Sequence, residues 1–240
     1  MQLVADPGVF PPIPPSNLDD ASAIVAHEWA AFGQVEEMKN HWDRPGWTPD
    51  TRAYYWMLTF PDAPALIDHA RHCQSALRHL GLDDIKEDGL HLTLGRIGRV
   101  GEISQEQLDA LAAAVSIRTP EAFTLHAIPL TASRGAVRYS VAPWTPILHL
   151  HAVLAAAGTS LGLPLRQPTS VLRPHLGIAY CNRRLSARTV RDAVRPLRDL
   201  AVAEVPVQHV RLVELRREGH SYQWETIHAL ALRWTEASVG

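Results

Sequence analysis

Two short stretches of the chain each present one histidine in a setting that suits acid–base chemistry. The first is His91 in the run His-Leu-Thr-Leu, and the second is His175 in the run His-Leu-Gly-Ile. Both runs are expected to form strands, in which alternate side chains point to the same face. His91 then shares a face with Thr93, and His175 with Gly177, while the aliphatic residues between them enter the core. Two histidines that face one substrate are the minimal apparatus for proton transfer on a phosphodiester.

The two imidazoles can divide the roles of acid and base. Free histidine has a pKa of about 6.5, so one ring can accept a proton while the other donates one near neutral pH. The sequence assigns neither role to a particular histidine. The hydroxyl of Thr93 is a candidate to hold a phosphate oxygen, and so is the guanidinium of Arg173, two residues before His175.

The elements that must position these residues are read from hydrophobic spacing and turn signals. Strands are predicted at residues 53–60, 91–97, 123–130, 136–141, 175–180, 205–215 and 222–232. Helices are predicted at residues 20–39, 63–80, 104–115, 144–161 and 190–197, the third opened by a capping box of Ser104 and Gln107. The glycine-rich stretch 95–101 is interpreted as a flexible turn after the first histidine strand.

The order of these elements is repeated along the chain, which indicates an α+β fold. A helix, a histidine strand, a helix and a strand pair occur twice in succession, so we expect an internal duplication with a pseudo-twofold axis between the histidines. Residues 1–50 are predicted to form a proline-rich arm with a helix and a connector. Residues 51–240 are predicted to form one domain of two pseudo-repeats.

An aromatic segment at residues 40–47 allows two interpretations. It is either a connector whose tryptophans pack on the domain, or a lid in which Trp42, Trp47 and Arg44 stack on a base. Tyr139 and Tyr180 are further candidates to stack on a base or line the site.

The bulk properties exclude several classes of protein. The chain has 240 residues, with 46% hydrophobic and 20% charged residues, and a net charge of -2. This composition is globular and gives no general basic surface for long nucleic acid, although a local basic cleft is allowed. No run of about 18 apolar residues predicts a membrane span, and no signal peptide is evident. We therefore expect a cytoplasmic monomer with no membrane association, in which Cys73 and Cys181 stay reduced.

The histidine content also raises a metal hypothesis. The chain has 13 histidines, and His69, His72 and His79 fall on one predicted helix, while His149 and His151 lie close together in sequence. No HExxH motif or Cys/His cluster accompanies them. They are interpreted as surface or interhelical residues, and no metal is predicted.

The paired motifs resemble those of the 2H phosphoesterase superfamily, and within it the 2'-5' RNA ligase-like and cyclic phosphodiesterase group. The resemblance rests on His-x-Thr at His91 and on the Arg-Pro-His run that ends at His175, in this order of elements. It implies a bilobal fold, with two pseudo-symmetric antiparallel-sheet lobes and outer helices around a central cleft. It also implies catalysis by His91 and His175 without a metal or cofactor. The implied substrates are 2',3'-cyclic phosphates or 2'-5' linkages in RNA or nucleotides, either hydrolysed or joined by reversible ligation.

The chain departs from the family pattern at Gly177, where a second threonine or serine is expected. A backbone N–H or water can replace the missing hydroxyl, because glycine lets a phosphate approach the chain closely. A neighbour such as Arg173, Ser170 or Tyr180 can compensate instead. The remaining alternative is a weakened site, which makes the protein a nucleotide- or RNA-binding module rather than an enzyme.

Overall fold

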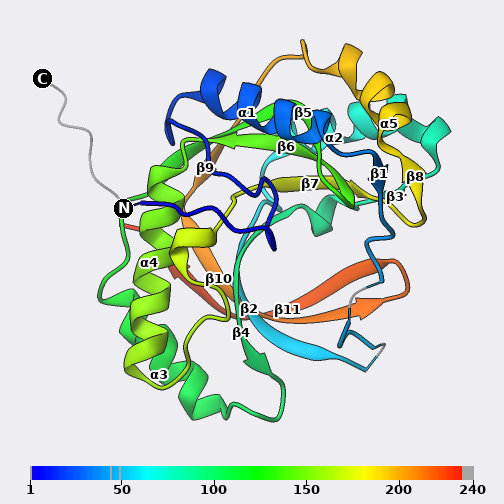
Figure 1. The fold of residues 1–240 in the computed structure, drawn as a ribbon. Coiled ribbons are helices and arrows are strands. Elements are labelled where there is room, and N and C mark those ends of the chain that lie inside the picture. Colours follow the sequence, from blue (N-terminus) through cyan, green and yellow to red (C-terminus); the bar gives the residue numbers. More distant parts are fainter. Residues whose placement is uncertain (1, 44, 49, 234–240) are drawn as a thin grey trace, which may run out of the picture.

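The computed structural model describes residues 2–43, 45–48 and 50–233, and it is built around two curled antiparallel sheets (Figure 1). One sheet has four strands in the order β11-β10-β2-β4, and the other has five in the order β3-β7-β6-β5-β9. A two-stranded sheet pairs β1 with β8. The predicted α+β fold with two antiparallel-sheet lobes and outer helices is confirmed.

The bounds of these strands and of the helices that cover them are as follows. The strands are β1 (Glu37–Met38), β2 (Arg52–Thr59), β3 (Asp83–Asp84), β4 (His91–Arg99), β5 (Phe123–Ala132), β6 (Ala136–Ala142), β7 (Leu176–Tyr180), β8 (Leu185–Ser186), β9 (Ala203–Val207), β10 (His209–Glu218) and β11 (Ser221–Ala231). The α-helices are α1 (Ala21–Gly33), α2 (Pro64–Leu77), α3 (Gln105–Ser116), α4 (Thr145–Ser160) and α5 (Ala187–Val194). Four short 3-10 helices include η2 (Glu87–Gly89) and η3 (Thr169–Val171).

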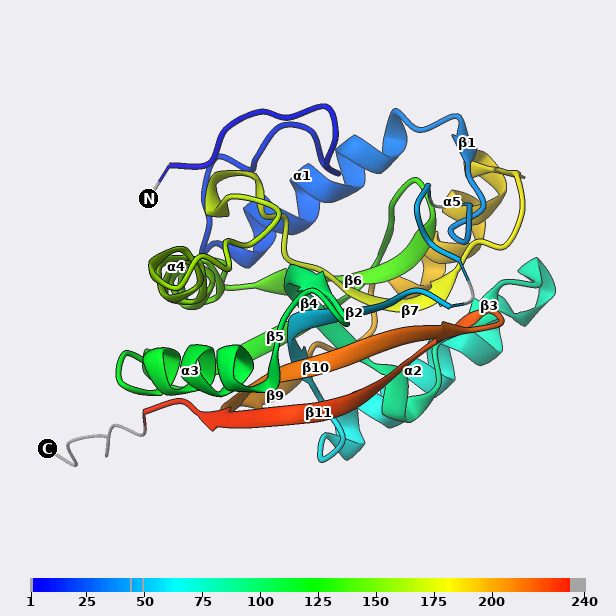
Figure 2. The same cartoon turned by 90° about the horizontal axis from the view of Figure 1, so that it is seen from below.

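The helices form the outer layers around the two sheets. α1 packs on β5 and β6, α5 on β5, and α2 on β7 and β9. α3 and α4 pack together at one end of the molecule, where α3 contacts β11 and α4 contacts β4. Figure 2 shows α1 and α2 on opposite sides of the molecule.

The strand order shows how the two halves of the chain are combined. The sequence predicts two consecutive units, but each sheet takes strands from both halves. The first histidine strand, β4, pairs with β2, and β2 pairs with β10 from the end of the chain. The second histidine strand, β7, pairs with β6, and β6 pairs with β5. Both β5 and β6 belong to the first predicted unit. Each half therefore contributes its last strands to the other lobe, which holds the lobes together.

The histidine strand β4 is longer than the sequence suggests. The prediction of a flexible turn over residues 95–101 is wrong, because β4 continues to Arg99 and pairs with β2 over its whole length. Two register shifts occur in this pairing, between Tyr54 and Tyr55 and between Trp56 and Met57. The glycines of the stretch are accommodated in a bulged strand. The capping box at Ser104 and Gln107 is confirmed at the start of α3.

The N-terminal part of the chain packs on the five-stranded sheet through a buried ion pair. Glu28 of α1 is fully buried and accepts hydrogen bonds from Arg138 Nη2 at 3.1 Å and from the Ser140 hydroxyl at 2.6 Å, both on β6. Burial raises the pKa of Glu28, and the positive charge of Arg138 opposes this effect. Such a pair fixes how α1 sits on the sheet, because separating it leaves a buried charge without a partner.

A buried histidine lies between α4 and the first histidine strand. His151 is fully buried, and its Nδ1 lies 2.8 Å from the Thr169 hydroxyl of η3. Burial lowers the pKa of His151 from 6.5 to about 4. Folding therefore favours the neutral ring, and the unfolded chain binds more protons than the native protein between these two values.

Acidification is therefore expected to destabilise the protein through His151. The stabilising contribution is fully present above pH 6.5 and is lost as the pH falls toward 4, with a cost of about 2 kcal/mol at pH 5. Urea unfolding at pH 7.5 and pH 5 measures this loss, and His151→Gln should reduce it. His149→Gln, an exposed neighbour on the same helix, serves as the control. An equal acid sensitivity in the wild type and His151→Gln would contradict this assignment.

Candidate active site

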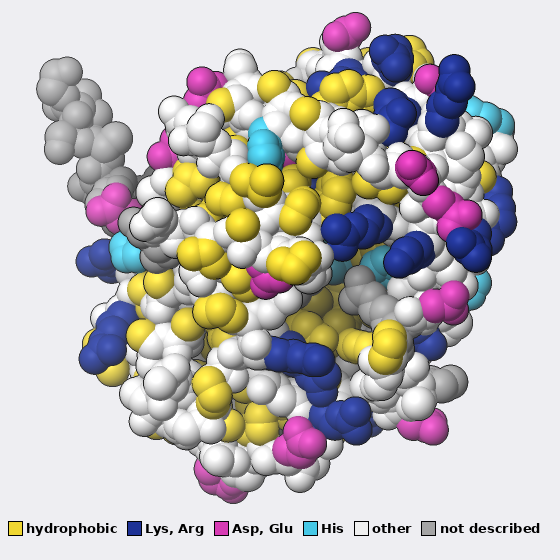
Figure 3. All heavy atoms as spheres, in the orientation of Figure 1, with side chains coloured by type: hydrophobic (Ala, Val, Ile, Leu, Met, Phe, Trp, Pro, Cys, Tyr) yellow, Lys and Arg dark blue, Asp and Glu magenta, His cyan; other side chains and the backbone are white. Residues whose placement is uncertain are grey.

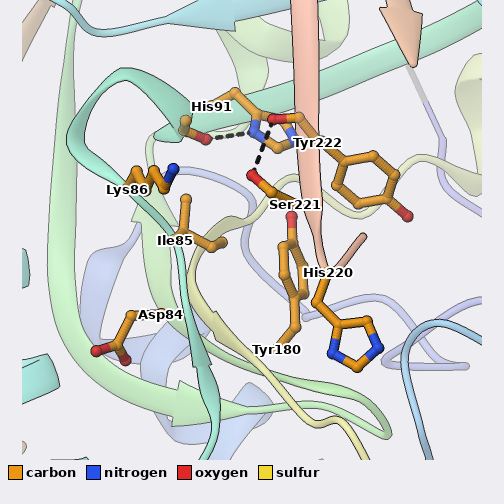
Figure 4. Close-up of a pocket in the computed structure, with 9 residues that line it drawn as sticks. Asp84, Ile85, Lys86, His91, Tyr180, His220, Ser221 and Tyr222 are labelled. Atoms are coloured by element: carbon orange, nitrogen blue, oxygen red, sulfur yellow. Dashed lines mark hydrogen bonds between the residues drawn. The ribbon is translucent and has the colours of Figure 1, made fainter. Parts of the chain in front are cut away.

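Each of the two predicted histidines is held by an equivalent hydrogen bond from its ring to the main chain. His91 Nδ1 lies 2.8 Å from the carbonyl oxygen of Gly89, and His175 Nδ1 lies 2.8 Å from that of Arg173. In each case the carbonyl belongs to the residue two positions earlier, as Figure 4 shows for His91. A carbonyl oxygen only accepts, so Nδ1 must carry the proton in both rings. The neutral form of each ring then has its lone pair on Nε2, which is the nitrogen that can act as a base.

The burial of the two motifs follows the predicted alternation. Leu92 and Leu94 of β4 are buried, whereas His91 and Thr93 are partly exposed. His175 is exposed and directly precedes β7, whose five residues are all buried. The second strand therefore begins one residue later than predicted.

β4 of the four-stranded sheet contacts β7 of the five-stranded sheet. In the space-filling view, a hollow lies between the lobes, with apolar side chains inside it, histidine at its edge, and lysine or arginine above and below (Figure 3). The structure thus combines histidine with positive charge along the junction of the lobes, where the central cleft is expected.

The curl of the four-stranded sheet brings its far edge back to His91. Three strand spacings separate β4 from β11, which is about 14 Å in a flat sheet. The His91 ring nevertheless lies 5.4 Å from the Trp224 ring and 6.5 Å from the Tyr222 ring of β11. β11 also contacts η2, just before His91. The curl therefore places residues from the end of the chain beside the first histidine.

A narrow pocket lies beside His91 as a result (Figure 4). It is enclosed by the turn before β4, the end of β7 and the turn between β10 and β11. Its lining residues are Asp84, Ile85, Lys86, Gly89, His91, Tyr180, His220, Ser221 and Tyr222. Lys86 supplies an ammonium group beside His91 that can pair with an anion, whereas the Ser221 hydroxyl donates to the Tyr222 carbonyl and Asp84 adds a carboxylate to the lining.

The aromatic segment 40–47 joins the two sheets next to this pocket. His41 stacks on Tyr180 of β7 with ring centroids 3.9 Å apart, and its Nε2 lies 3.1 Å from the Tyr222 hydroxyl of β11. Trp42 is buried and contacts both tyrosines. This agrees with the packing interpretation of Trp42. Trp47 packs against Tyr222, and Arg44 of the proposed lid lies outside the described residues.

Asp83 fixes the turn between β10 and β11 against this aromatic cluster. Its carboxylate accepts hydrogen bonds from Trp42 Nε1, His220 Nδ1 and Asn182 Nδ2, each at 2.8 Å. The His220 ring also stacks on Trp42 with a centroid distance of 5.3 Å. These contacts hold His220 and Ser221 at the rim of the pocket.

Gly177 is buried, and an isoleucine occupies the space beside it. A Cβ added at Gly177 would lie 3.1 Å from Ile85 Cδ1. The main chain of Ile85 is held in place, since its N–H donates to the Ile178 carbonyl at 2.8 Å and its carbonyl accepts from Gln74. Where the family pattern places a hydroxyl, this chain therefore places an apolar side chain.

Several other predicted residues do not line the pocket: His175, Thr93, Arg173 and Tyr139. The Arg173 guanidinium is 4% exposed and donates to the carbonyls of Val4, Pro11 and Leu172. Tyr139 is fully buried, and its hydroxyl lies 2.8 Å from His69 Nδ1 on α2. The expectation that Tyr139 stacks on a base is wrong, because its ring faces α2 within the core. Tyr180 does line the pocket.

Several lining residues were not predicted from the sequence, including five with polar or aromatic side chains: Asp84, Lys86, His220, Ser221 and Tyr222. They lie in short turns or at the ends of strands, where no spacing marks a site. Tyr222 and Trp224 alternate along β11, and this is the one signal that an aromatic face could turn toward His91.

The part of the chain that the structure describes offers neither a metal-binding cluster nor a membrane-spanning helix. Among residues 2–43, 45–48 and 50–233, no three His, Cys, Asp or Glu side chains group in a way that would hold a metal ion. Within the same residues, no helix has the length and apolar character that crossing a membrane requires.

A sequence model of the 2'-5' RNA ligase superfamily matches residues 60–219, two thirds of the chain. The chain therefore belongs to this superfamily, and the resemblance to 2H phosphoesterases is confirmed. Membership implies phosphoesterase or ligase-type activity. A search of curated proteins finds no match.

Solved structures share the fold at low sequence identity. LigT of Escherichia coli in its apo form is 17% identical, with a TM-score of 0.54, over 76% of this chain and 98% of LigT. LigT complexed with 3'-AMP is 18% identical over the same shares, with a TM-score of 0.53. TT0787 of Thermus thermophilus is 16% identical, with a TM-score of 0.57 and again 76% and 98% coverage.

The matched hydrogen bonds predict the tautomer of both histidines. Long-range ¹H–¹⁵N spectra, recorded at a pH where both rings are neutral, should show His91 and His175 protonated at Nδ1, because each Nδ1 faces a carbonyl oxygen. Assignment by His91→Gln and His175→Gln identifies the two sets of signals. Protonation at Nε2 in either ring would contradict the arrangement described above.

Proposed function

We propose that this protein is a metal-independent phosphodiesterase that uses His91 and His175 as an acid–base pair. Its proposed substrates are 2',3'-cyclic phosphates or 2'-5' linkages at the ends of RNA or in nucleotides, and reversible 2'-5' ligation uses the same histidines with a ribose hydroxyl in place of water. The observation that carries the proposal is the pair of Nδ1–carbonyl bonds, which prepare both Nε2 atoms for proton transfer. Membership of the superfamily and the LigT structures solved with phosphate and 3'-AMP support the substrate class.

In the proposed hydrolysis, one neutral histidine takes a proton from water through Nε2, and in ligation it takes the proton from a ribose hydroxyl instead. The oxygen that loses this proton bonds to phosphorus, and the bond from phosphorus to one ribose oxygen breaks. The second histidine, protonated at Nε2, gives its proton to that ribose oxygen. Charge and proton number are thus conserved without a metal ion or cofactor.

The negative charge that develops on the phosphate needs donors, and the His91 side supplies them. Thr93 lies two residues along β4 from His91, and Lys86 and Ser221 line the same pocket as His91. Figure 4 shows the Lys86 side chain extending toward the space beside the His91 ring, and the Ser221 hydroxyl bonded to the Tyr222 carbonyl. Tyr180 forms a wall of this space. Preorganised donors of this kind carry a large part of phosphoryl-transfer catalysis.

The His175 side lacks one such donor because of Gly177. By analogy with the loss of one oxyanion donor, this costs about 1–3 kcal/mol of transition-state stabilisation. The corresponding rate reduction is about tenfold to two-hundredfold, which slows an enzyme without abolishing its activity. The alternative function is a binding module for nucleotides or RNA, and the Ile85 side chain against Gly177 is the observation that favours it.

The test is turnover of the four nucleoside 2',3'-cyclic phosphates in the presence of EDTA. His91→Ala and His175→Ala should each lower kcat by about 10²- to 10⁴-fold, because each removes a proton-transfer group. His149→Ala, which changes an exposed histidine on α4, is the matched control and should behave like the wild type. The product, a 2'- or 3'-phosphate, identifies the bond that is cut.

Three outcomes would change the proposal. Activity that EDTA removes would exclude the metal-independent mechanism. Full activity in either histidine variant would exclude the acid–base pair. Nucleotide binding without turnover in the wild type would favour the binding module.

A further inference from the structure

We propose that the N-terminal arm, residues 2–15, is a positioning element for His175, and that Arg173 transmits its effect. The catalytic part of this inference rests on the proposed function, whereas the structural part does not. The family match begins at residue 60, so the arm is outside the region that the family comparison describes. Arg173 is thereby a positioning residue rather than a phosphate ligand.

Arg173 holds the arm through its guanidinium group. Its Nη2 donates to the Val4 carbonyl at 2.7 Å, and its Nε donates to the Pro11 carbonyl at 3.0 Å. The guanidinium is almost completely buried, so its N–H groups must be satisfied by protein atoms. A buried charged donor without a partner is strongly unfavourable, and therefore the arm and Arg173 depend on each other.

The arm is shaped to present these carbonyls together. The Asp6 N–H donates to the Pro12 carbonyl at 2.8 Å, which closes the arm into a loop, and the Val4 N–H donates to the Ser170 carbonyl of η3 at 3.0 Å. Leu3 and Pro11 are buried within the lobe. The loop thus meets Arg173 with its main-chain carbonyls, and the negative charge of the Asp6 side chain also favours the charged guanidinium.

Arg173 also holds His175, through its main-chain carbonyl. The carbonyl of Arg173 accepts the hydrogen bond from His175 Nδ1 at 2.8 Å. The side chain of Arg173 therefore binds the arm, while its main-chain carbonyl orients the His175 ring. A shift of Arg173 moves the acceptor on which the tautomer and direction of the His175 ring depend.

His91 provides an internal comparison, because its acceptor is held locally. The Gly89 carbonyl belongs to η2, in which the Gly89 N–H donates to the Lys86 carbonyl at 2.9 Å. This local turn, rather than the arm, holds the acceptor of His91. Release of the arm should therefore disturb His175 and leave His91 unchanged.

The test compares Arg173→Met and Arg173→Lys in the full-length chain. Arg173→Met removes the guanidinium contacts to the arm, whereas lysine keeps the charge but cannot reproduce the forked geometry. Arg191→Met is the matched control, because Arg191 Nη2 also donates to three main-chain carbonyls, those of Phe32, Gly33 and Val35, on a different part of the fold.

Three readouts are needed. Amide exchange at Val4 and Asp6 reports release of the arm, and ¹⁵N spectra report the tautomers of His175 and His91. Kinetics on a 2',3'-cyclic phosphate report kcat and KM. In Arg173→Met we expect faster exchange, loss of the pure Nδ1–H tautomer at His175 only, and a fall in kcat of up to about 100-fold with little change in KM. Arg173→Lys should be intermediate in every readout.

The proposal is overturned if the arm is released while the His175 tautomer and kcat stay as in the wild type. It is also overturned if the arm stays in place in Arg173→Met, or if Arg191→Met disturbs His175 equally. Should Arg173→Met fail to fold, Arg173→Lys decides by the same criteria. If the wild type shows no turnover, the proposed function fails, but the exchange and tautomer measurements still decide the role of the arm.

Discussion

The orientation of both histidines depends on the same kind of hydrogen bond, from the histidine Nδ1 to the carbonyl two residues earlier. It fixes the tautomer and the direction of each ring, and it does so with main-chain atoms that no substitution of the acceptor residue removes. The carbonyl must then be held in place by the structure around it. A 3-10 turn does this for His91, and a buried arginine with a main-chain loop does it for His175. The two histidines thus share a geometry but differ in what maintains it.

The remainder of the fold brings the two histidine strands together. Each sheet combines strands from both halves of the chain, so neither lobe can form its sheet without the other half. The aromatic cluster of His41, Trp42, Tyr180 and Tyr222 then joins the lobes at the pocket. These rings bury a large apolar area and make edge and stacking contacts, which favour one arrangement of the lobes. A rigid junction suits a reaction in which two proton-transfer groups must face one phosphate.

The sequence predicted the features that depend on local periodicity. The alternation of His91 and Thr93 with Leu92 and Leu94, and the capping box at Ser104, are visible in the spacing of residue types alone. The role of Arg173 could not be predicted, because its partners in the arm are carbonyls more than 160 positions away and carbonyls have no residue signature. The curl that brings Trp224 to His91, and the contact of Ile85 with Gly177, likewise arise from tertiary packing.

The central claim, that His91 and His175 form an acid–base pair, is tested most directly by the pH dependence of kcat/KM for a 2',3'-cyclic phosphate. We expect a bell-shaped dependence of kcat/KM on pH, in which one limb reflects titration of the base and the other titration of the acid. His91→Ala and His175→Ala should each retain a residual rate from which one limb is missing, and the missing limb should differ between the two variants. A profile that keeps both limbs in either variant would contradict the pairing of these two histidines.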